Sequence, residues 1–158
     1  MPVAKQDFCR VLGRFAAGVT VVTTVDDDGR PYGLTATAFT SVSLEPPLVL
    51  VCVDQGSDSH PHFHASGVFA VNFLGDEHEH LSRIFAVSGG DKFTEIAFRR
   101  GVTGAPVLAD ALGFLECRIV EIVAAGDHTI FLGQVESADA RDGAPLLYYC
   151  GTYRRLER

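Results

Sequence analysis

The stretch Gly33-Leu34-Thr35-Ala36-Thr37-Ala38-Phe39-Thr40-Ser41-Val42-Ser43 decides how we interpret this chain. Side chains alternate across a β-strand, so every second residue shares a face. One face carries Thr35, Thr37, Phe39, Ser41 and Ser43, which are mostly hydroxyl residues. The other face is small and mostly apolar. The pattern predicts one strand over 33–43 with a hydroxyl-rich face.

A hydroxyl-rich face of this kind has two interpretations. Small residues let a flat ligand approach the backbone closely, and hydroxyl, N–H and C=O groups can bond to its polar edge; a flavin ring is such a ligand. The alternative is a sheet strand whose Thr and Ser face is simply solvated, which is common.

The flanking sequence adds more strands and a few short helices. The β-branched run 19–25 ends at the turn Asp26-Asp27-Asp28-Gly29, and the apolar run 48–53 predicts a fully buried strand. Further strands are expected at 68–74, 112–124, 128–138, 146–149 and 153–156. Helices are expected at 5–16, 60–65 and 76–87, with Ser59 as an N-cap and Leu81, Ile84 and Phe85 on an apolar face. The pattern predicts a mainly β protein, a closed antiparallel barrel in a single domain over 1–158.

Composition excludes several classes of protein. The 158 residues carry a net charge of −7, which argues against a nucleic-acid or anionic-membrane partner. No apolar stretch reaches the length of a membrane span, and the N-terminus lacks a signal-peptide pattern, so we expect a cytoplasmic location. The four cysteines form no C-x-x-C pair, and three of them lie in apolar runs, where small core residues are expected.

Three loops are candidates for chemistry. Gly56-Ser57-Asp58-Ser59 precedes a helix and suits a phosphate, with Asp58 turned to solvent, although a plain helix cap is the alternative. Gly90-Asp91-Lys92-Phe93 places a cation beside an aromatic ring; the alternative is a surface loop anchored by one Phe. In the segment from Gly126 to Gly133, His128 stands where a turn becomes a strand and is a candidate proton source or hydrogen-bond donor; the alternative is a polar turn residue.

The six histidines raise a metal hypothesis. Only His60 and His64 would share a helix face, and no cysteine or carboxylate completes a ligand set at a typical spacing. We therefore predict no metal site. Neither a P-loop nor a G-x-G-x-x-G dinucleotide motif is present.

Taken in order, these segments resemble the short-chain flavin reductases, the reductase components of two-component flavin monooxygenases. The matching segments cover nearly the whole chain: 15–24, 33–47, 69–74, 91–93, 126–133, 145–149 and 153–154. The most specific are Gly126-Asp127-His128-Thr129 and Thr40-Ser41-Val42-Ser43-Leu44-Glu45-Pro46-Pro47.

The resemblance implies an antiparallel Greek-key FMN-binding split barrel that forms a homodimer with the flavin near the subunit interface. It implies that one wall of the flavin site is formed by Thr35, Ala36, Thr37, Ser41, Val42 and Ser43. Ser57, Ser59 and His60 would lie near the ribityl and phosphate groups, and Lys92 and Phe93 would close over the flavin. His128 and Tyr153 would lie beside the nicotinamide. Cys150 departs from the family pattern, in which a basic residue is expected.

The predicted activity is NAD(P)H-dependent reduction of FMN or FAD by hydride transfer, with NADH or NADPH as co-substrate and a flavin-dependent monooxygenase as a partner. Three alternatives stay open. They are an FMN-retaining oxidase of the pyridoxamine-phosphate-oxidase-like type, a non-enzymatic flavin-binding redox module, and a His-rich metal protein.

Overall fold

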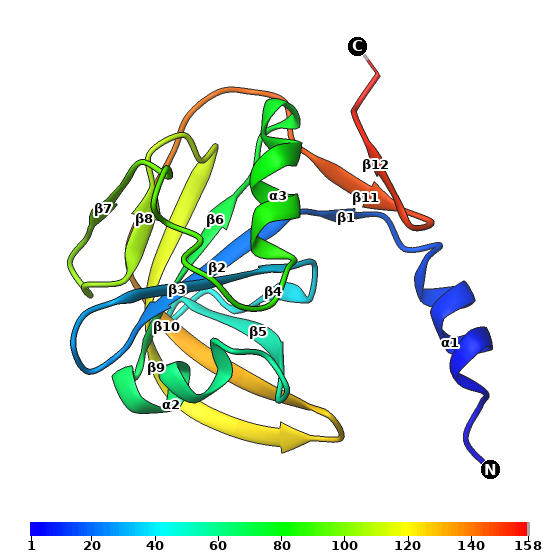
Figure 1. The fold of residues 1–158 in the computed structure, drawn as a ribbon. Coiled ribbons are helices and arrows are strands. Elements are labelled where there is room, and N and C mark those ends of the chain that lie inside the picture. The colour runs from blue at the N-terminus through cyan, green and yellow to red at the C-terminus, as the bar shows by residue number, and fades with distance from the viewer. Residues whose placement is uncertain (158) are drawn as a thin grey trace.

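Strands make up most of the regular structure of residues 1–157, the part that the computed structural model describes (Figure 1). The helices are α1 (Lys5–Leu12), α2 (His60–Ser66) and α3 (Glu79–Phe85), with a short 3-10 turn η1 (Asp76–His78) before α3. The strands are β1 (Ala17–Gly18), β2 (Thr20–Val25), β3 (Pro31–Ala36), β4 (Phe39–Ser43), β5 (Leu48–Asp54), β6 (Val68–Phe73), β7 (Phe98–Arg100), β8 (Pro106–Leu108), β9 (Gly113–Ala125), β10 (His128–Ala140), β11 (Leu147–Tyr149) and β12 (Thr152–Arg154).

Seven strands form one antiparallel sheet in the order β3-β2-β6-β9-β10-β5-β4. This confirms a mainly β, antiparallel fold. The prediction of a closed barrel is wrong: in residues 1–157 the two edge strands, β3 and β4, do not pair with each other. The Ala38 carbonyl nevertheless accepts a hydrogen bond from the Cys52 N–H of β5 at 3.0 Å, so the chain crosses between the two edges here.

The predicted single strand over 33–43 is also wrong, because the chain turns at Thr37 and Ala38. The Phe39 N–H donates to the Thr37 carbonyl at 2.9 Å, a tight turn that no continuous strand contains. Two strands result, β3 paired with β2 and β4 paired with β5. The alternating hydroxyl face therefore does not form one continuous wall.

Apolar side chains fill two main clusters on this scaffold. The first joins the sheet to α2 through Phe63, Phe69 and Phe131, all fully buried. The second lies beneath α3 and includes Leu81 and Phe85. Ile84, expected on the same helix face, is exposed. The run 48–53 alternates between buried and half-buried residues and is not buried throughout, because β5 presents only one face to the core.

The N- and C-terminal segments form an arm that extends away from the main sheet (Figure 1). A small sheet in the order β1-β11-β12 makes up its base, and α1 stands at its end. The predicted helix over 5–16 ends earlier, at Leu12, where the Gly13 carbonyl accepts the Cys150 N–H. No residue of α1 is buried, so its apolar face, including Phe8 and Leu12, has no partner within residues 1–157.

The irregular segment 94–111 contains the short hairpin β7–β8. Buried Glu116 of β9 anchors the turn of this hairpin by accepting hydrogen bonds from the Val102 and Thr103 N–H groups and from the Thr103 hydroxyl. Across residues 1–157, every helix is too short or too polar to cross a membrane.

The cysteines divide by environment. Cys117 is buried, and its burial, with nearby Glu116, raises the pKa of its thiol to about 12. Cys52 is half-buried, while Cys9 and Cys150 are exposed. The apolar runs predicted three cysteines in the core, whereas in the structure Cys117 alone of the four is buried.

Candidate functional site

A cavity of about 580 Å³ opens between β3 and two loops. It is lined by residues 30–33 at the start of β3, by Asp58 and Ser59 before α2, and by residues 89–94 after α3. Three predicted site residues, Ser59, Lys92 and Phe93, thus come together. A cavity with a few convergent polar groups is the usual form of a small-molecule site.

Asp58 connects the two loops. Its carboxylate Oδ2 accepts the N–H of Gly89 at 2.5 Å. Asp58 is exposed, as predicted, but it also lines the cavity and holds the glycine loop in place. Gly89 and Gly90 both have positive φ angles, of 79° and 76°, which only glycine adopts without strain.

Ser59 is nearly fully buried at the position before α2. Its expected side-chain cap is absent from the described structure, because its backbone is already helical, with φ −79° and ψ −22°. Its N–H donates to Ser57 Oγ at 3.2 Å. The Ser59 hydroxyl is therefore not used as a helix cap.

Lys92 places the charge of its ammonium group at the cavity. The Nζ atom donates to the Gly33 carbonyl of β3 at 3.4 Å. Burial lowers the pKa of Lys92, and Asp58 opposes this by favouring the charged form. An ammonium group has three donors, so one bond to Gly33 leaves others for a ligand.

Phe93 anchors this loop. Its ring is 7% exposed and packs against Phe85 and Phe98 at centroid distances of 5.1 and 5.2 Å. This is the anchoring role that the sequence left open as the alternative. Gly33 allows strand β3 to lie close to the Phe85 ring, since a Cβ at this position would lie 3.0 Å from a Phe85 ring carbon.

The hydroxyl residues of β3 and β4 have different environments. The Thr35 hydroxyl donates to the backbone carbonyl of Ser82 in α3 at 2.6 Å. Ala36 is buried in the core. Thr37, Ser41 and Val42 are exposed, whereas Thr35 and Ser43 are half-buried, so the first three are the most accessible to a ligand.

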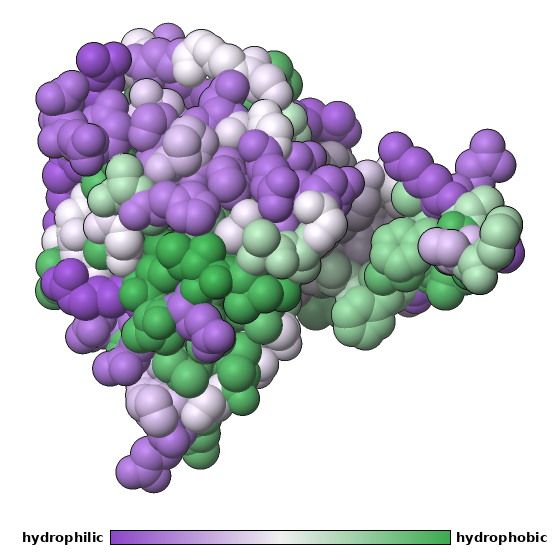
Figure 2. Space-filling model, turned by 90° about the horizontal axis from the view of Figure 1, so that it is seen from below, coloured by the Kyte–Doolittle hydropathy of each residue, from purple (hydrophilic) through white to green (hydrophobic). Residues whose placement is uncertain are grey.

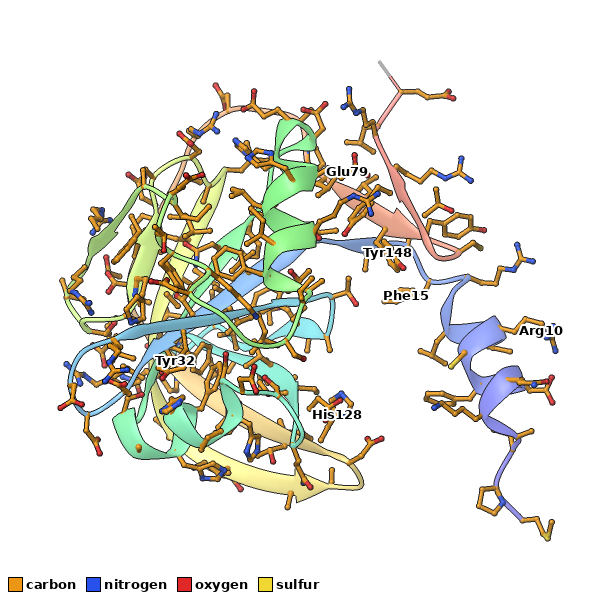
Figure 3. All side chains as sticks on the ribbon, viewed as in Figure 1. Arg10, Phe15, Tyr32, Glu79, His128 and Tyr148 are labelled. Atoms are coloured by element: carbon orange, nitrogen blue, oxygen red, sulfur yellow. The ribbon has the colours of Figure 1, made fainter. Side chains whose placement is uncertain are left out.

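The histidines of α2 take part in local packing. His60 Nε2 and Thr129 Oγ1 of β10 share a hydrogen bond of 2.8 Å. His60 and His64 share a face, as predicted, with ring centroids 5.0 Å apart. His62 stacks on Tyr32, at 3.8 Å, on the β3 side of the body (Figure 3). No cluster of three or more candidate metal ligands occurs in residues 1–157.

His128 begins β10 and is partly exposed at the end of the β9–β10 hairpin, below the arm in Figure 3. Its Nδ1 lies 2.7 Å from Asp127 Oδ1, and this hydrogen bond lowers the pKa of Asp127. The Gln55 amide donates to the His128 carbonyl at 2.9 Å. The Asp127 contact orients the ring and leaves Nε2 as the atom available to a ligand.

Tyr153 lies in the arm but contacts α3. Its hydroxyl shares a hydrogen bond of 2.7 Å with Ser82 Oγ, and the Arg83 guanidinium lies 5.0 Å from the centre of its ring. No hydrogen bond or ring contact joins Tyr153 to His128 within residues 1–157. The two residues predicted to flank the nicotinamide are thus not in contact within one chain.

Sequence reasoning missed two residues of this region. Tyr32 lines the cavity, and Ser82 contacts both Thr35 and Tyr153. A signal for Ser82 was present, since it is a polar residue next to Leu81 and three positions before Phe85, on the apolar face of the predicted helix.

Comparisons with known proteins identify the family of this chain. The model of the flavin reductase like domain family matches residues 12–157, so the chain belongs to that family. It is 42% identical over 152 residues to the reductase component of a 4-nitrophenol 4-monooxygenase/4-nitrocatechol 2-monooxygenase from Rhodococcus opacus, covering 96% of this chain and 81% of that protein. It is 41% identical over 151 residues to an NADH-dependent flavin reductase from a Rhodococcus species, covering 94% and 84%.

Among solved structures, an NADH:FAD oxidoreductase from Streptomyces globisporus C-1027 superposes with a TM-score of 0.91 at 40% identity, covering 100% of this chain and 98% of that one. The resemblance seen in the sequence and the mainly β fold of this family are therefore confirmed.

Proposed function

We propose that this protein is an NAD(P)H-dependent flavin reductase that releases reduced flavin to a partner monooxygenase. The observation that carries the proposal is the cavity beside β3, where Lys92, Ser59 and Gly33 meet in a chain of the flavin reductase family. A bound flavin would supply the redox chemistry, accepting hydride from the nicotinamide.

The residues of the chain would bind and orient the two ligands. Lys92 offers a cation to the flavin phosphate, and the exposed hydroxyls of Thr37 and Ser41 can bond to the polar edge of the ring. His128, oriented by Asp127, can hold the nicotinamide or donate a proton from Nε2. Among residues 1–157, the basic side chains that line this cavity are Lys92 and Arg30. A site with few cations suits a flavin that is released.

A homodimer is part of this proposal. The exposed apolar face of α1 and the exposed Val120, Ile122 and Val123 of β9 are surfaces that a second copy would cover. Figure 2 shows apolar side chains on the underside of the body and on the arm. A second chain would also allow Tyr153 of one copy and His128 of the other to meet at one site. Sedimentation at micromolar concentration should give twice the 17.0 kDa mass of the chain; a monomer would contradict this.

The decisive experiment measures NADH and NADPH oxidation with FMN, FAD or riboflavin present in excess. We expect multiple turnovers with at least one pair. Flavin that binds without any turnover would favour a non-enzymatic module, and tightly retained FMN without NAD(P)H oxidation would favour an oxidase of the pyridoxamine-phosphate-oxidase-like type. The reaction consumes NAD(P)H, so the proposal includes a cytoplasmic location.

A further inference from the structure

Ser82 is a buried polar residue in the middle of α3. Its exposed fraction is 0%, and its helix neighbours Leu81 and Phe85 belong to the apolar cluster beneath α3. A buried hydroxyl is costly unless it is hydrogen-bonded, and an alanine or leucine would pack here without that requirement. The contacts of Ser82 therefore indicate why a hydroxyl is present.

Ser82 makes hydrogen bonds to other segments through two different groups. The side-chain Oγ meets the hydroxyl of Tyr153 of β12 at 2.7 Å. The backbone carbonyl accepts the hydroxyl of Thr35 of β3 at 2.6 Å, and also the N–H of Ala86 at 3.1 Å. One residue of α3 thus connects the arm to the edge strand that borders the cavity.

Tyr153 depends on α3 for its position. Its strand, β12, is the edge of the small arm sheet and, within residues 1–157, pairs only with β11. The Tyr153 ring packs at the margin of the apolar cluster, against Tyr148 at 5.4 Å and beneath Arg83. These ring contacts tolerate sliding and tilting, whereas the bond to Ser82 Oγ defines where the phenol oxygen lies.

We propose that Ser82 is a positioning residue: it holds Tyr153 of the arm at a fixed position relative to strand β3, and so determines how the nicotinamide is bound. The proposal rests on the proposed function, in which Tyr153 of one copy meets His128 of the other at the site where the nicotinamide is held. Ser82 itself does not line the cavity and acts only through its two partners.

The hydrogen bonds of Ser82 to Tyr153 and to Thr35 can be separated by substitution. Ser82→Ala removes the bond to Tyr153 and keeps the backbone carbonyl that holds Thr35. We expect a three- to ten-fold rise in KM for NAD(P)H, roughly what one neutral hydrogen bond contributes, with flavin affinity nearly unchanged. Thr35→Val breaks the other bond, and we expect it to weaken flavin binding more than nicotinamide binding.

A double-mutant cycle with Tyr153→Phe tests whether Ser82 acts through Tyr153. Both single variants lose the same hydrogen bond, so the double variant should have nearly the KM of either single variant. Melting curves recorded in parallel identify any general loss of stability. A lower Tm with unchanged KM in Ser82→Ala, or additive effects in the double variant, would overturn the proposal.

Two further outcomes are distinguishable. If Ser82→Ala does not fold, Ser82→Cys keeps nearly the same volume with a much weaker hydrogen bond, and KM should still rise; an unchanged KM would overturn the inference. If the wild-type protein oxidises no NAD(P)H with any flavin, the proposed function fails, and the inference fails with it. An active wild-type enzyme with unaffected Ser82 variants rejects the inference alone.

Discussion

The carboxylate of Asp58 and the backbone N–H of Gly89 are joined by a hydrogen bond of 2.5 Å, which ties the loop before α2 to the glycine loop after α3. The two residues are separated by 31 positions, and the cavity beside β3 lies between their loops. Asp58 thus has two opposing effects: it orders the cavity wall, and it brings a negative charge close to Lys92.

These effects can be separated by comparing Asp58→Ala with Asp58→Asn. Alanine removes the acceptor, so the glycine loop should loosen and both FMN and riboflavin should bind about three- to ten-fold more weakly. Asparagine keeps an acceptor oxygen and removes the charge, so FMN should gain affinity relative to riboflavin. Fluorescence titration with both flavins measures this; identical behaviour of the two variants would exclude a role for the charge.

Lys92→Ala should weaken FMN and FAD binding more than riboflavin binding. The half-buried ammonium faces a cavity, and charge-assisted bonds to phosphate are stronger than neutral ones. We expect roughly a ten-fold loss for FMN. Arg118→Ala is the matched control, because it removes an exposed cation of β9 that pairs with Glu136 of β10 and does not line the cavity. An equal loss for riboflavin would show that Lys92 does not recognise the phosphate.

Thr37→Val should reduce flavin affinity by a few-fold to about ten-fold while the fold is retained, since it removes mainly a hydroxyl at an exposed position. Thr40→Val is the control, because its hydroxyl donates to the nearby Ser41 carbonyl. Isothermal titration with FMN compares them. If Thr37→Val binds flavin like the wild type, the exposed hydroxyls after β3 are merely solvated.

His128→Ala should slow flavin reduction by NAD(P)H without a large change in flavin affinity. A general acid contributes about 10²–10⁴-fold, and a residue that only orients the nicotinamide contributes less. Stopped-flow reduction of pre-bound flavin, recorded beside a melting curve, measures the effect. Asp127→Asn, which keeps an acceptor for His128 Nδ1, should give a smaller loss. Wild-type rates in a stably folded His128→Ala variant would remove His128 from the site.

The lowered pKa of His60 predicts a specific pH dependence of stability. Burial, and secondarily the nearby His64, lower the pKa of His60. Below the ordinary histidine pKa of about 6.5 the unfolded chain therefore takes up a proton more readily than the folded protein, and stability is lost as the pH falls. We expect Tm to fall less steeply from about pH 7 to about pH 5.5 in His60→Gln than in the wild type. A slope in His60→Gln as steep as that of the wild type would exclude a contribution from His60.

Local sequence determined most of the strands and turns. The β-branched run of β2 and the turn at Gly29, with its φ of 79°, follow from the preferences of a few adjacent residues. The hairpin of β9 and β10 around Gly126 was predicted for the same reason. Ordered motifs, such as Gly126-Asp127-His128-Thr129, were sufficient to indicate the family, because they depend on residue type and spacing alone.

Tertiary structure decided what each candidate side chain contacts. The alternation over 33–43 could not reveal the turn at Thr37, because that turn brings the chain from one sheet edge to the other and depends on β2 and β5. Nor could it reveal that the Thr35 hydroxyl is taken by Ser82, 47 residues away. Hydrogen bonds between distant segments, like those of Asp58 with Gly89 and Ser82 with Tyr153, form only when the free energy of packing offsets the entropy lost on closing the loops between them.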